Sequence, residues 1–403
     1  MIPIRRTAAL LAAAGAATVL FACGGGSGTT VGTGTLKVSL TDAPACGYDQ
    51  VNVTVSKVRV HSSDRAGDSD DGWRDITLSP ARKINLLDLN NGVLLELGQT
   101  SLPEGRYTQV RLVLDPNTGN GGANTVVPTG SVTEISLDTP SAVQSGIKLT
   151  HAFDIAARQR TDLVLDFDAC KSIVAKGNGG LALKPVVAVI PALLNGIHGY
   201  VDPALAATGR PAISAQRNGE VIRSTVPNPA TGEFTIARLE PGNYDVVITA
   251  DNSAAAVVAG VPVASTTSMV ELSTAAAPIR LAIALIAPGS VSGVVQLSPP
   301  SVSDSALMSA RQSFASGPTV TIRYQYANLT SGAWVLSNLP RAVPLYASYS
   351  AALPLVFSAS GNVAPGVGQY AVTAAAIGYT AQTLTPVDLS TGNKSAVDFI
   401  LLP

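Results

Sequence analysis

Leu36-Lys37-Val38-Ser39-Leu40-Thr41-Asp42-Ala43-Pro44 is the first stretch of this chain with a clear structural period. Apolar side chains at positions 36, 38 and 40 alternate with polar ones, which is the period of a strand with one buried face. Pro44 ends the run, because proline has no N–H to donate to a sheet. The stretch therefore predicts a β-strand at the start of a folded domain.

The same period returns in later segments. Val51, Val53 and Val55 alternate with polar residues, whereas Val58 and Val60 continue in the opposite phase. That change of phase predicts a β-bulge near residues 56–57, or a strand that is buried on both faces. Further strands are expected at 107–114, 147–153, 163–167 and 181–190, and residues 85–97 fit either a strand or a short helix.

The composition agrees with short strands and turns. The 403 residues are 46% apolar and 13% charged, with 37 Gly and 26 Pro. The net charge of −1 excludes a large basic field and argues against a nucleic-acid partner. We expect an all-β protein of tandem β-sandwich domains, immunoglobulin-like or prealbumin-like.

The N-terminus has the form of an export signal. Arg5 and Arg6 precede a charge-free apolar run, 8–22, which is shorter than the roughly 20 residues that span a bilayer. The run ends Leu20-Phe21-Ala22-Cys23, which resembles the lipobox of bacterial lipoproteins. The resemblance implies a diacylglyceryl group on the Cys23 thiol, cleavage before Cys23 and acylation of the new amine. The alternative is an ordinary secretory signal in which the cysteine is incidental.

Residues 24–34 are rich in Gly, Ser and Thr, the composition of a flexible tether. In enterobacterial lipoproteins, Asp after the lipidated cysteine favours the inner membrane, so Gly24 implies the outer membrane by resemblance. The predicted location is the cell envelope, with a lipid anchor and a body that faces the periplasm or the cell surface.

Two cysteines remain if Cys23 carries lipid. Cys46 and Cys170 are 124 residues apart, and in an oxidising compartment they are expected to form a disulfide. Two buried thiols or a metal site are the alternatives. A metal site is disfavoured, since structural zinc takes about four ligands and the chain has three His.

The first body of the chain resembles a domain family of unknown function found in bacterial lipoproteins. The resemblance is carried by four motifs, Leu36 to Pro44, Val51-Asn52-Val53-Thr54-Val55, Ile84-Asn85-Leu86-Leu87-Asp88-Leu89 and Leu102-Pro103-Glu104-Gly105-Arg106-Tyr107. It implies a location and a type of fold, because the family has no established activity.

The rest of the chain reads as a divergent tandem repeat. Gly199 and Gly293 lie in two similar opening segments 94 residues apart, and Gly232 and Gly332 begin two Gly-x-Phe/Trp segments 100 residues apart. Both units resemble the carboxypeptidase-regulatory-like β-sandwich, with Leu239-Glu240-Pro241-Gly242-Asn243-Tyr244 in the first and a degraded Leu339-Pro340 in the second. Residues 281–286 are expected to be the closing strand of the first repeat.

The predicted division of the chain has five parts. They are a signal peptide (1–22), a lipidated cysteine with its linker (23–34), a β-sandwich of unknown function (35–194), a carboxypeptidase-regulatory-like β-sandwich (195–287) and a second, divergent one (288–403).

Few residues carry candidate chemistry, and no cofactor is implied. Asp64, Asp68, Asp70 and Asp71 form a weak calcium candidate with the wrong register for an EF-hand, so a solvated acidic loop is preferred and no metal is assigned. The three His share no short motif, and the known hydrolase and nucleotide motifs are absent from the sequence.

Aromatic side chains offer a weak ligand candidate. Trp73, Tyr324 and Tyr326 could stack on a sugar if they are exposed, with Tyr346 and Tyr349 nearby in sequence. The preferred function is a non-catalytic binding or structural module of the envelope, with a glycan or an envelope protein as partner besides the membrane. The alternatives are an accessory subunit or hydrolase with an unrecognised site, and an assembly component that adds a strand to a partner's sheet.

Overall fold

The computed structural model describes residues 32–43, 47–118, 122–177, 179–192, 194–301, 304–315 and 317–403, without the side chains of Pro140, Ser141, Cys170 and Pro191. These ranges are nearly all β, as the sequence predicts. Their helical elements are short: η1 (Leu86–Leu89), α1 (Pro140–Gln144), α2 (Ala169–Ser172) and α3 (Pro203–Thr208). None of these described helices is long and apolar enough to cross a bilayer.

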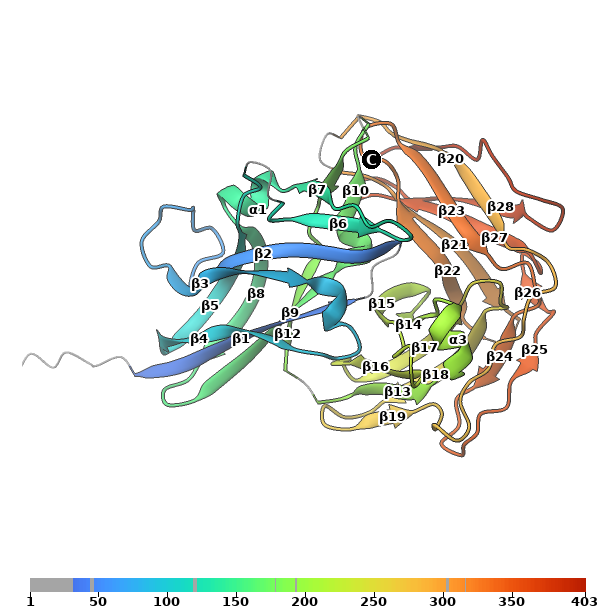
Figure 1. Ribbon diagram of the computed structural model, residues 1–403, viewed down its shortest axis with the longest axis horizontal. Helices are drawn as coiled ribbons and strands as arrows, with labels where there is room; N and C mark the ends of the chain where they lie inside the picture. Colours follow the sequence, from blue (N-terminus) through green and yellow to red (C-terminus); the bar gives the residue numbers. More distant parts are fainter. Residues whose placement is uncertain are drawn as a thin grey trace, which may run out of the picture.

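The first unit is a sandwich of two sheets around one core (Figure 1). Its strands are β1 (Thr33–Ala43), β2 (Tyr48–His61), β3 (Arg74–Asn85), β4 (Leu95–Pro103), β5 (Gly105–Leu114), β6 (Thr125–Pro128), β7 (Ile135–Asp138), β8 (Ile147–Ile155), β9 (Arg160–Asp168), β10 (Ile173–Ala175), β11 (Leu181–Leu183) and β12 (Val187–Pro191). One sheet has the order β12-β9-β1-β4, and the other runs β10-β11-β7-β6-β2-β5-β8 with β3 paired to β2.

The alternation in β1 sets its orientation in this sandwich. Leu36, Val38 and Leu40 have no exposed surface and lie in the core, and burial of such side chains contributes about 1.5–3 kcal/mol each. The predicted bulge is confirmed, since the register of β2 shifts between Val55 and Lys57 against both β3 and β5.

The second and third units repeat one arrangement. The strands of the second are β13 (Gly196–Tyr200), β14 (Ala212–Arg217), β15 (Glu220–Thr225), β16 (Glu233–Ala237), β17 (Gly242–Thr249), β18 (Ala256–Val263) and β19 (Met269–Glu271). Those of the third are β20 (Gly289–Leu297), β21 (Leu307–Phe314), β22 (Thr319–Tyr326), β23 (Ala333–Leu339), β24 (Leu345–Ser348), β25 (Ser358–Ala359), β26 (Val363–Ala364), β27 (Gln369–Ala375), β28 (Gln382–Asp388) and β29 (Phe399–Leu401). Each unit has a three-stranded sheet, β16-β13-β19 or β23-β20-β29, in which the opening strand is central and pairs in parallel with the closing strand.

The predicted closing strand at 281–286 is wrong. Apart from an isolated bridge between Ser253 and Ile283, this stretch forms no ladder. Ile283 is 82% exposed and Leu285 fully exposed, so the apolar run is a surface connection between the two units. The strand that pairs in parallel with β13 is instead β19. The composition of this short segment did not indicate a strand.

One sheet belongs to both repeats. β24 of the third unit pairs in parallel with β18 of the second, which gives the sheet β15-β14-β17-β18-β24-β25. On β17, Val246 faces the core of the second unit, while its neighbour Val247 faces the core of the third. Both faces of this sheet are therefore buried, and the second and third units share a layer.

Candidate functional site

The acidic loop between β2 and β3 is organised by its own protein contacts. Asp68 pairs with Arg111 of β5, and a carboxylate oxygen of Asp70 accepts a hydrogen bond from the N–H of Gly67 at 2.9 Å. Among the described residues, no group of three or more His, Cys, Asp or Glu side chains is placed to hold a metal ion. The calcium alternative gains no support from this geometry.

Trp73 holds this loop against the sheet. The guanidinium groups of Arg59 and Arg111 each lie 4.7 Å from its ring centroid, and its Nε1–H donates to the carbonyl of Gly67 at 2.8 Å. Such cation–π contacts contribute about 0.5–1 kcal/mol each at partly exposed sites. Trp73 is thus engaged in the packing of this loop, and the geometry adds no support for stacking on a sugar.

Tyr324 lies where the three units meet. Its hydroxyl is hydrogen-bonded to Ser224 of the second unit, the Nζ of Lys171 in the first unit lies 5.6 Å from its ring centroid, and burial raises its pKa. Tyr326 is half-buried two residues further along β22, and burial raises its pKa too. The pair is part of a junction between units and does not form an exposed platform.

The cysteines fall largely outside the described residues. Cys23 and Cys46 lie outside the described residues. Cys170 is the second residue of α2, and its side chain is not among those described. The flanking backbone is informative, because Ala43 of β1 pairs with Asp168 of β9 and the N–H of Ala169 donates to the carboxylate of Asp42 at 3.1 Å. The chain segments that lead to positions 46 and 170 thus start side by side.

The rings of His61 and His198 are both engaged by other groups of the protein. The Nδ1 of His61 accepts from the N–H of Ser63 at 2.9 Å and its Nε2 lies 3.0 Å from the carbonyl oxygen of Asp71. His198 on β13 has Glu271 of β19 at 2.7 Å from Nδ1 and Glu233 of β16 at 3.1 Å from Nε2. Burial alone would lower the pKa of His198, but the two carboxylates outweigh it and raise that pKa.

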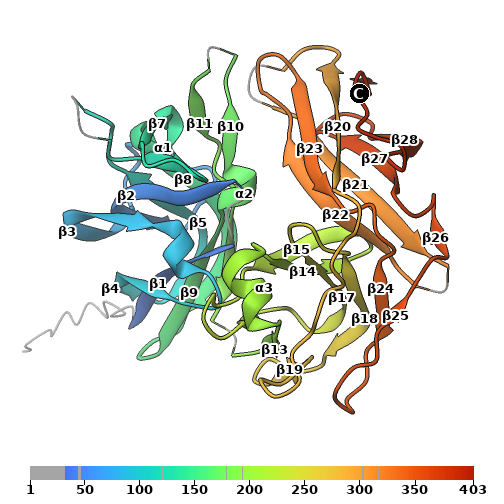
Figure 2. The same cartoon turned by 45° about the vertical axis from the view of Figure 1, so that its right-hand side comes forward.

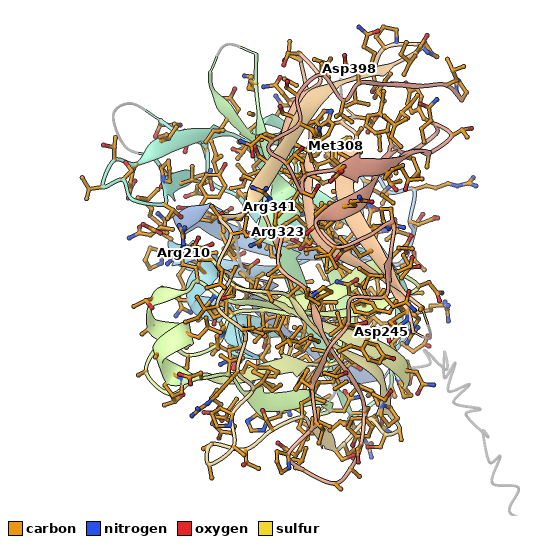
Figure 3. All side chains as sticks on the ribbon, turned by 90° about the vertical axis from the view of Figure 1, so that its right-hand side faces the viewer. Arg210, Asp245, Met308, Arg323, Arg341 and Asp398 are labelled. Atoms are coloured by element: carbon orange, nitrogen blue, oxygen red, sulfur yellow. The ribbon has the colours of Figure 1, made fainter. Side chains whose placement is uncertain are left out.

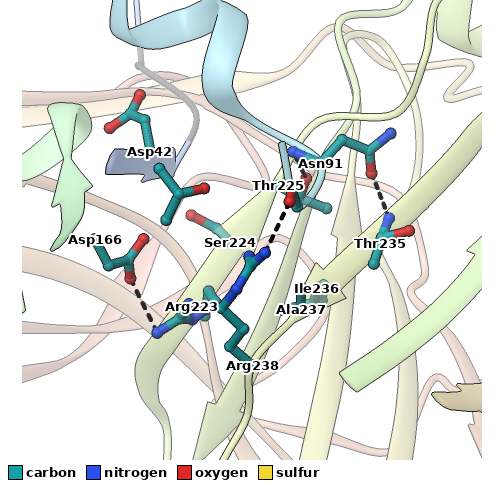
Figure 4. A pocket seen from close by; sticks show the side chains of 12 residues that line it. Asp42, Asn91, Asp166, Arg223, Ser224, Thr225, Thr235, Ile236, Ala237 and Arg238 are labelled. Carbon is teal, nitrogen blue, oxygen red and sulfur yellow. Dashed lines mark hydrogen bonds and ion pairs between the residues drawn. The ribbon is translucent and has the colours of Figure 1, made fainter. Parts of the chain in front are cut away.

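A buried polar junction joins the first and second units (Figure 4). Asp166 of β9 forms an ion pair with Arg223 of β15 at 3.0 Å, with only 13% and 11% of the two side chains exposed. Burial raises the pKa of Asp166, and Arg223 offsets only part of that increase. Arg238 lies beside this pair, and its pKa is lowered by burial and by Arg223.

The Asn-Gly turn after η1 fits into this junction. The Asn91 side chain accepts from the N–H of Thr235 and donates to the carbonyl of Glu233 at 3.2 Å. The guanidinium of Arg238 donates to the carbonyl of Gly92 at 3.0 Å. Nothing local in the sequence indicates that this Asn-Gly turn would dock on β16 of another unit.

The second and third units are joined by a buried amide. Gln216 of β14 is fully buried, and its side chain donates to the carbonyl of Thr321 at 2.7 Å and accepts from the N–H of Thr321 at 2.8 Å. Nearby, Asp251 pairs with Arg210 and accepts from Asn338 at 2.7 Å, next to the partly buried Arg323. Arg210 and Arg323 are labelled in Figure 3. Burial lowers the pKa of Arg323, and Asp251 opposes that change.

The third unit also contacts the first, which closes the arrangement (Figure 2). The N–H of Leu329 donates to the carbonyl of Ala175 at 3.2 Å, and Lys184 forms an ion pair with Asp304 at 3.1 Å. Each unit therefore touches both others, and the body is a closed triad. A tandem repeat pattern in the sequence does not contain this information.

A groove of about 390 Å³ lies on the third unit beside this last contact. It is lined by the end of β20, by the segment that follows it and by the turn before β23, comprising residues 295–298, 300–301, 304–306 and 327–332. The small cavity at the junction of the first and second units, about 10 Å³, has room for about one water molecule. The groove on the third unit is therefore the better candidate for a binding site.

Residues 33–185 match the family model described as Domain of unknown function (DUF4382). The match covers most of the first unit and well under half of the chain. It agrees with the resemblance in the sequence motifs of β1, β2 and β5. No curated protein matches the chain.

Solved structures with some similarity include two bacterial pilins and the Bacillus anthracis TIE protein. The Bacillus anthracis TIE protein is 11% identical with a TM-score of 0.17, covering 92% of this chain and 50% of its own. The major pilin SpaA of Corynebacterium diphtheriae is 11% identical with a TM-score of 0.20, covering 92% and 100%, and BcpA, the major pilin subunit of Bacillus cereus, is 10% identical with a TM-score of 0.17, covering 92% and 99%. The chain thus spans half the length of the TIE protein, and at these scores no activity or partner carries over.

Proposed function

We propose that this protein is a lipid-anchored, non-catalytic module of the cell envelope, held at the outer membrane through Cys23, whose body serves as a structural or binding element. The sequence basis of the anchor is the export-like segment that ends in Leu20-Phe21-Ala22-Cys23. Two or more acyl chains are needed for stable anchoring, and a triacylated cysteine would carry three.

The observation that carries the structural part of this proposal is the closed triad. Buried polar contacts join the first unit to the second through Asp166 and Arg223, and the second to the third through Gln216 and Thr321. Because the three units constrain one another, they would move as one body on the tether. A stiff body on a flexible tether suits a spacer or a display element.

The attachment point of the tether fits this role. The tether leads directly into β1, a central strand that pairs with β4 on one side and with β9 on the other. A pull on the lipid anchor would therefore be distributed over two strand ladders.

The non-catalytic part of the proposal is supported by the engagement of the chemistry-bearing groups. The rings of His61 and His198 are held by backbone and carboxylate groups, and Trp73 contacts two guanidinium groups. General acid–base catalysis needs a positioned group that can reach a substrate. A hydrolase with an unrecognised site stays an alternative without an observation in its favour, and so does stacking of a glycan on Tyr324 and Tyr326.

A strand-adding assembly role is the second candidate, favoured by the edge strand β28. Five consecutive residues of this strand, 382–386, are exposed, and in the described sheet β28 pairs only with β27. Pro386 interrupts the row of donors on the strand, which is a common way to protect an edge from unwanted pairing. The edge is thus open but blunted.

The test is the mass and location of the mature protein in the native host. Wild-type protein is expected in the membrane fraction, with a mass that corresponds to cleavage before Cys23 plus three acyl chains. Cys23→Ala should remain unacylated and leave the membrane fraction. A soluble, unacylated wild-type protein would contradict the anchor.

A further inference from the structure

We propose that the groove on the third unit binds an extended peptide of a partner protein, which adds a strand to β20 beside Val295–Leu297. This goes beyond the proposed function and does not depend on the lipid anchor. It identifies a binding site and the chemical class of its ligand.

The floor of the groove is an unpaired strand edge. β23 pairs with β20 only as far as Val294, whereas β29 pairs with residues 295–297 from the other side. The N–H of Ser298 donates to Leu401 of β29 at 2.9 Å, while the N–H of Val295 points away from β29 and donates to Gly332 at 2.9 Å. Because backbone groups alternate in direction along a strand, the N–H and C=O of Leu297 point the same way as those of Val295, into the groove.

This edge has the dimensions of a short peptide site. The N–H of Val295 is taken by Gly332 and the backbone groups of Gln296 face β29, so the C=O of Val295 and the N–H and C=O of Leu297 are the groups that point toward a peptide. The volume of about 390 Å³ is in the range of small ligand sites. An antiparallel peptide would continue the position of β23 past its first residue, Ala333.

The walls of the groove are fixed by the first unit. On one side, the turn before β23 is held by the bond from Leu329 to Ala175, and Thr330 packs against Gly177. On the other side, Asp304 is held by Lys184, and Ser305 donates to the carbonyl of Ala327. The lining belongs to the third unit, and the contacts with the first unit hold it in place, which reduces the ordering cost of binding.

The residues that line the groove favour one class of ligand over others. Apart from Asp304, whose carboxylate is paired with Lys184, the lining side chains are uncharged, and none is aromatic. A sugar site would be expected to offer an aromatic face, and a phosphate site a free cation. Backbone groups with Ser, Thr and Asn side chains suit a neutral, extended peptide with small side chains, the mode known as β-strand addition.

The edge at Leu297 is a better candidate for strand addition than the edge strand β28. The β28 strand carries Pro386 and is exposed over residues 382–386, whereas the edge at Leu297 is short, enclosed by two walls and free of proline until Pro299. Enclosed, short edges bind a selected partner without inviting general aggregation.

The experiment uses mature protein in detergent and an array of acetylated, amidated hexapeptides made of Ala, Gly, Ser, Thr and Val. The best hexapeptide is then titrated in solution against wild type, Leu297→Pro and the matched control Leu297→Ala. Proline removes the groove-facing N–H without removing a donor to β29, and alanine removes only the side chain. Leu297→Pro should bind about tenfold more weakly than wild type, and Leu297→Ala within about threefold.

A second measurement covers the case in which Leu297→Pro does not fold. The hexapeptide is N-methylated at one position at a time and titrated against wild type. Loss of binding at every second position supports strand addition, since alternate peptide N–H groups would face β20. The proposal is overturned if no hexapeptide binds below about 1 mM, if N-methylation has no alternating effect, or if chitotetraose binds in the groove and no peptide does. None of these results bears on the mass of Cys23, so the anchor is tested separately.

Discussion

The hydroxyl of Tyr370 donates a hydrogen bond to the carbonyl of Pro340, across 30 residues of sequence. In the second unit, Tyr244 makes the corresponding bond to Glu240 at 2.7 Å from only four residues away. Both acceptors directly follow a buried leucine, Leu339 or Leu239. The third unit therefore keeps the bond although its sequence has lost the local tyrosine.

The first unit contains the same corner, with the hydroxyl of Tyr107 3.2 Å from the carbonyl of Pro103. Such a tyrosine corner fixes the entry of a strand into a β-sandwich. The degraded motif after Leu339 thus reflects replacement of the donor by Tyr370 of β27. The site of the bond is conserved among the three units while its donor is not.

Removal of these hydroxyl groups should destabilise the protein in a defined order. Tyr370→Phe leaves the buried carbonyl of Pro340 without its donor, which costs about 1–3 kcal/mol of unfolding free energy, and Tyr244→Phe should cost less because its bond to Glu240 is only partly buried. Tyr107→Phe should cost least, because its ring is more exposed and its bond is longer. Denaturant unfolding measures all three, with the half-buried Tyr349→Phe as a control. An equal effect of Tyr349→Phe and Tyr370→Phe would contradict this account.

The contact of His198 with two carboxylates predicts a pH-dependent stability. The pKa of His198 is raised in the folded protein, so its contribution is complete below the unfolded value of about 6.5. It is lost as the pH rises through the folded pKa. The groups that face the ring are Glu233, Glu271 and Tyr200.

The measurement is the unfolding free energy of wild type and His198→Gln from pH 5 to pH 9. The difference between the two proteins should shrink as the pH rises above about 6.5. Glu271→Gln should reduce the slope of that difference without a change of sign. A difference that stays constant over this range would show that His198 is not held as an imidazolium.

The amide bridge from Gln216 to Thr321 predicts cooperative unfolding of the second and third units. Gln216→Met leaves the N–H and C=O of Thr321 buried without partners, which should cost about 1–3 kcal/mol for each unsatisfied group. Because the two units share a sheet layer, the single thermal transition should move to lower temperature without splitting. Glu220→Gln on the exposed turn side of β15 serves as the control. Two separate calorimetric transitions in wild type would contradict the shared layer.

The alignment of β1 with β9 predicts the disulfide between Cys46 and Cys170. Reduction should add two protons to the mass of the mature protein, and Cys46→Ser should lower stability by up to about 4–5 kcal/mol in the chain-entropy model. The flanking pair Ala43 and Asp168 already aligns the two segments. Two free thiols in protein taken from the oxidising compartment would contradict the bridge, whatever the stability of the variant.

The sequence patterns predicted features that depend on neighbouring residues in the chain, such as buried strand faces and bulges. The alternation around Val38 identified a buried strand face, and the phase change near Val55 located a bulge. Residues 281–286 have the same apolar content but lie on the surface, because the place beside β13 is taken by β19. Propensity could not distinguish these two segments.

The contacts between the three units could not be predicted from sequence patterns. Asp166 and Arg223 are separated by 57 positions, and neither belongs to a motif that indicates its partner. The groove arises from the same cause, since its walls depend on contacts between the third unit and Lys184 of the first. Candidates chosen as exposed aromatics, such as Tyr324, proved to be part of these junctions.

Small-angle X-ray scattering of the soluble Cys23→Ser form tests the closed triad most directly. A compact body formed by residues 32–403 should have a radius of gyration of about 21 Å and a pair-distance distribution with a single peak. A markedly larger radius with an extended tail would describe three units strung along the chain. That result would contradict the closed triad and, with it, the preorganised groove beside Leu297.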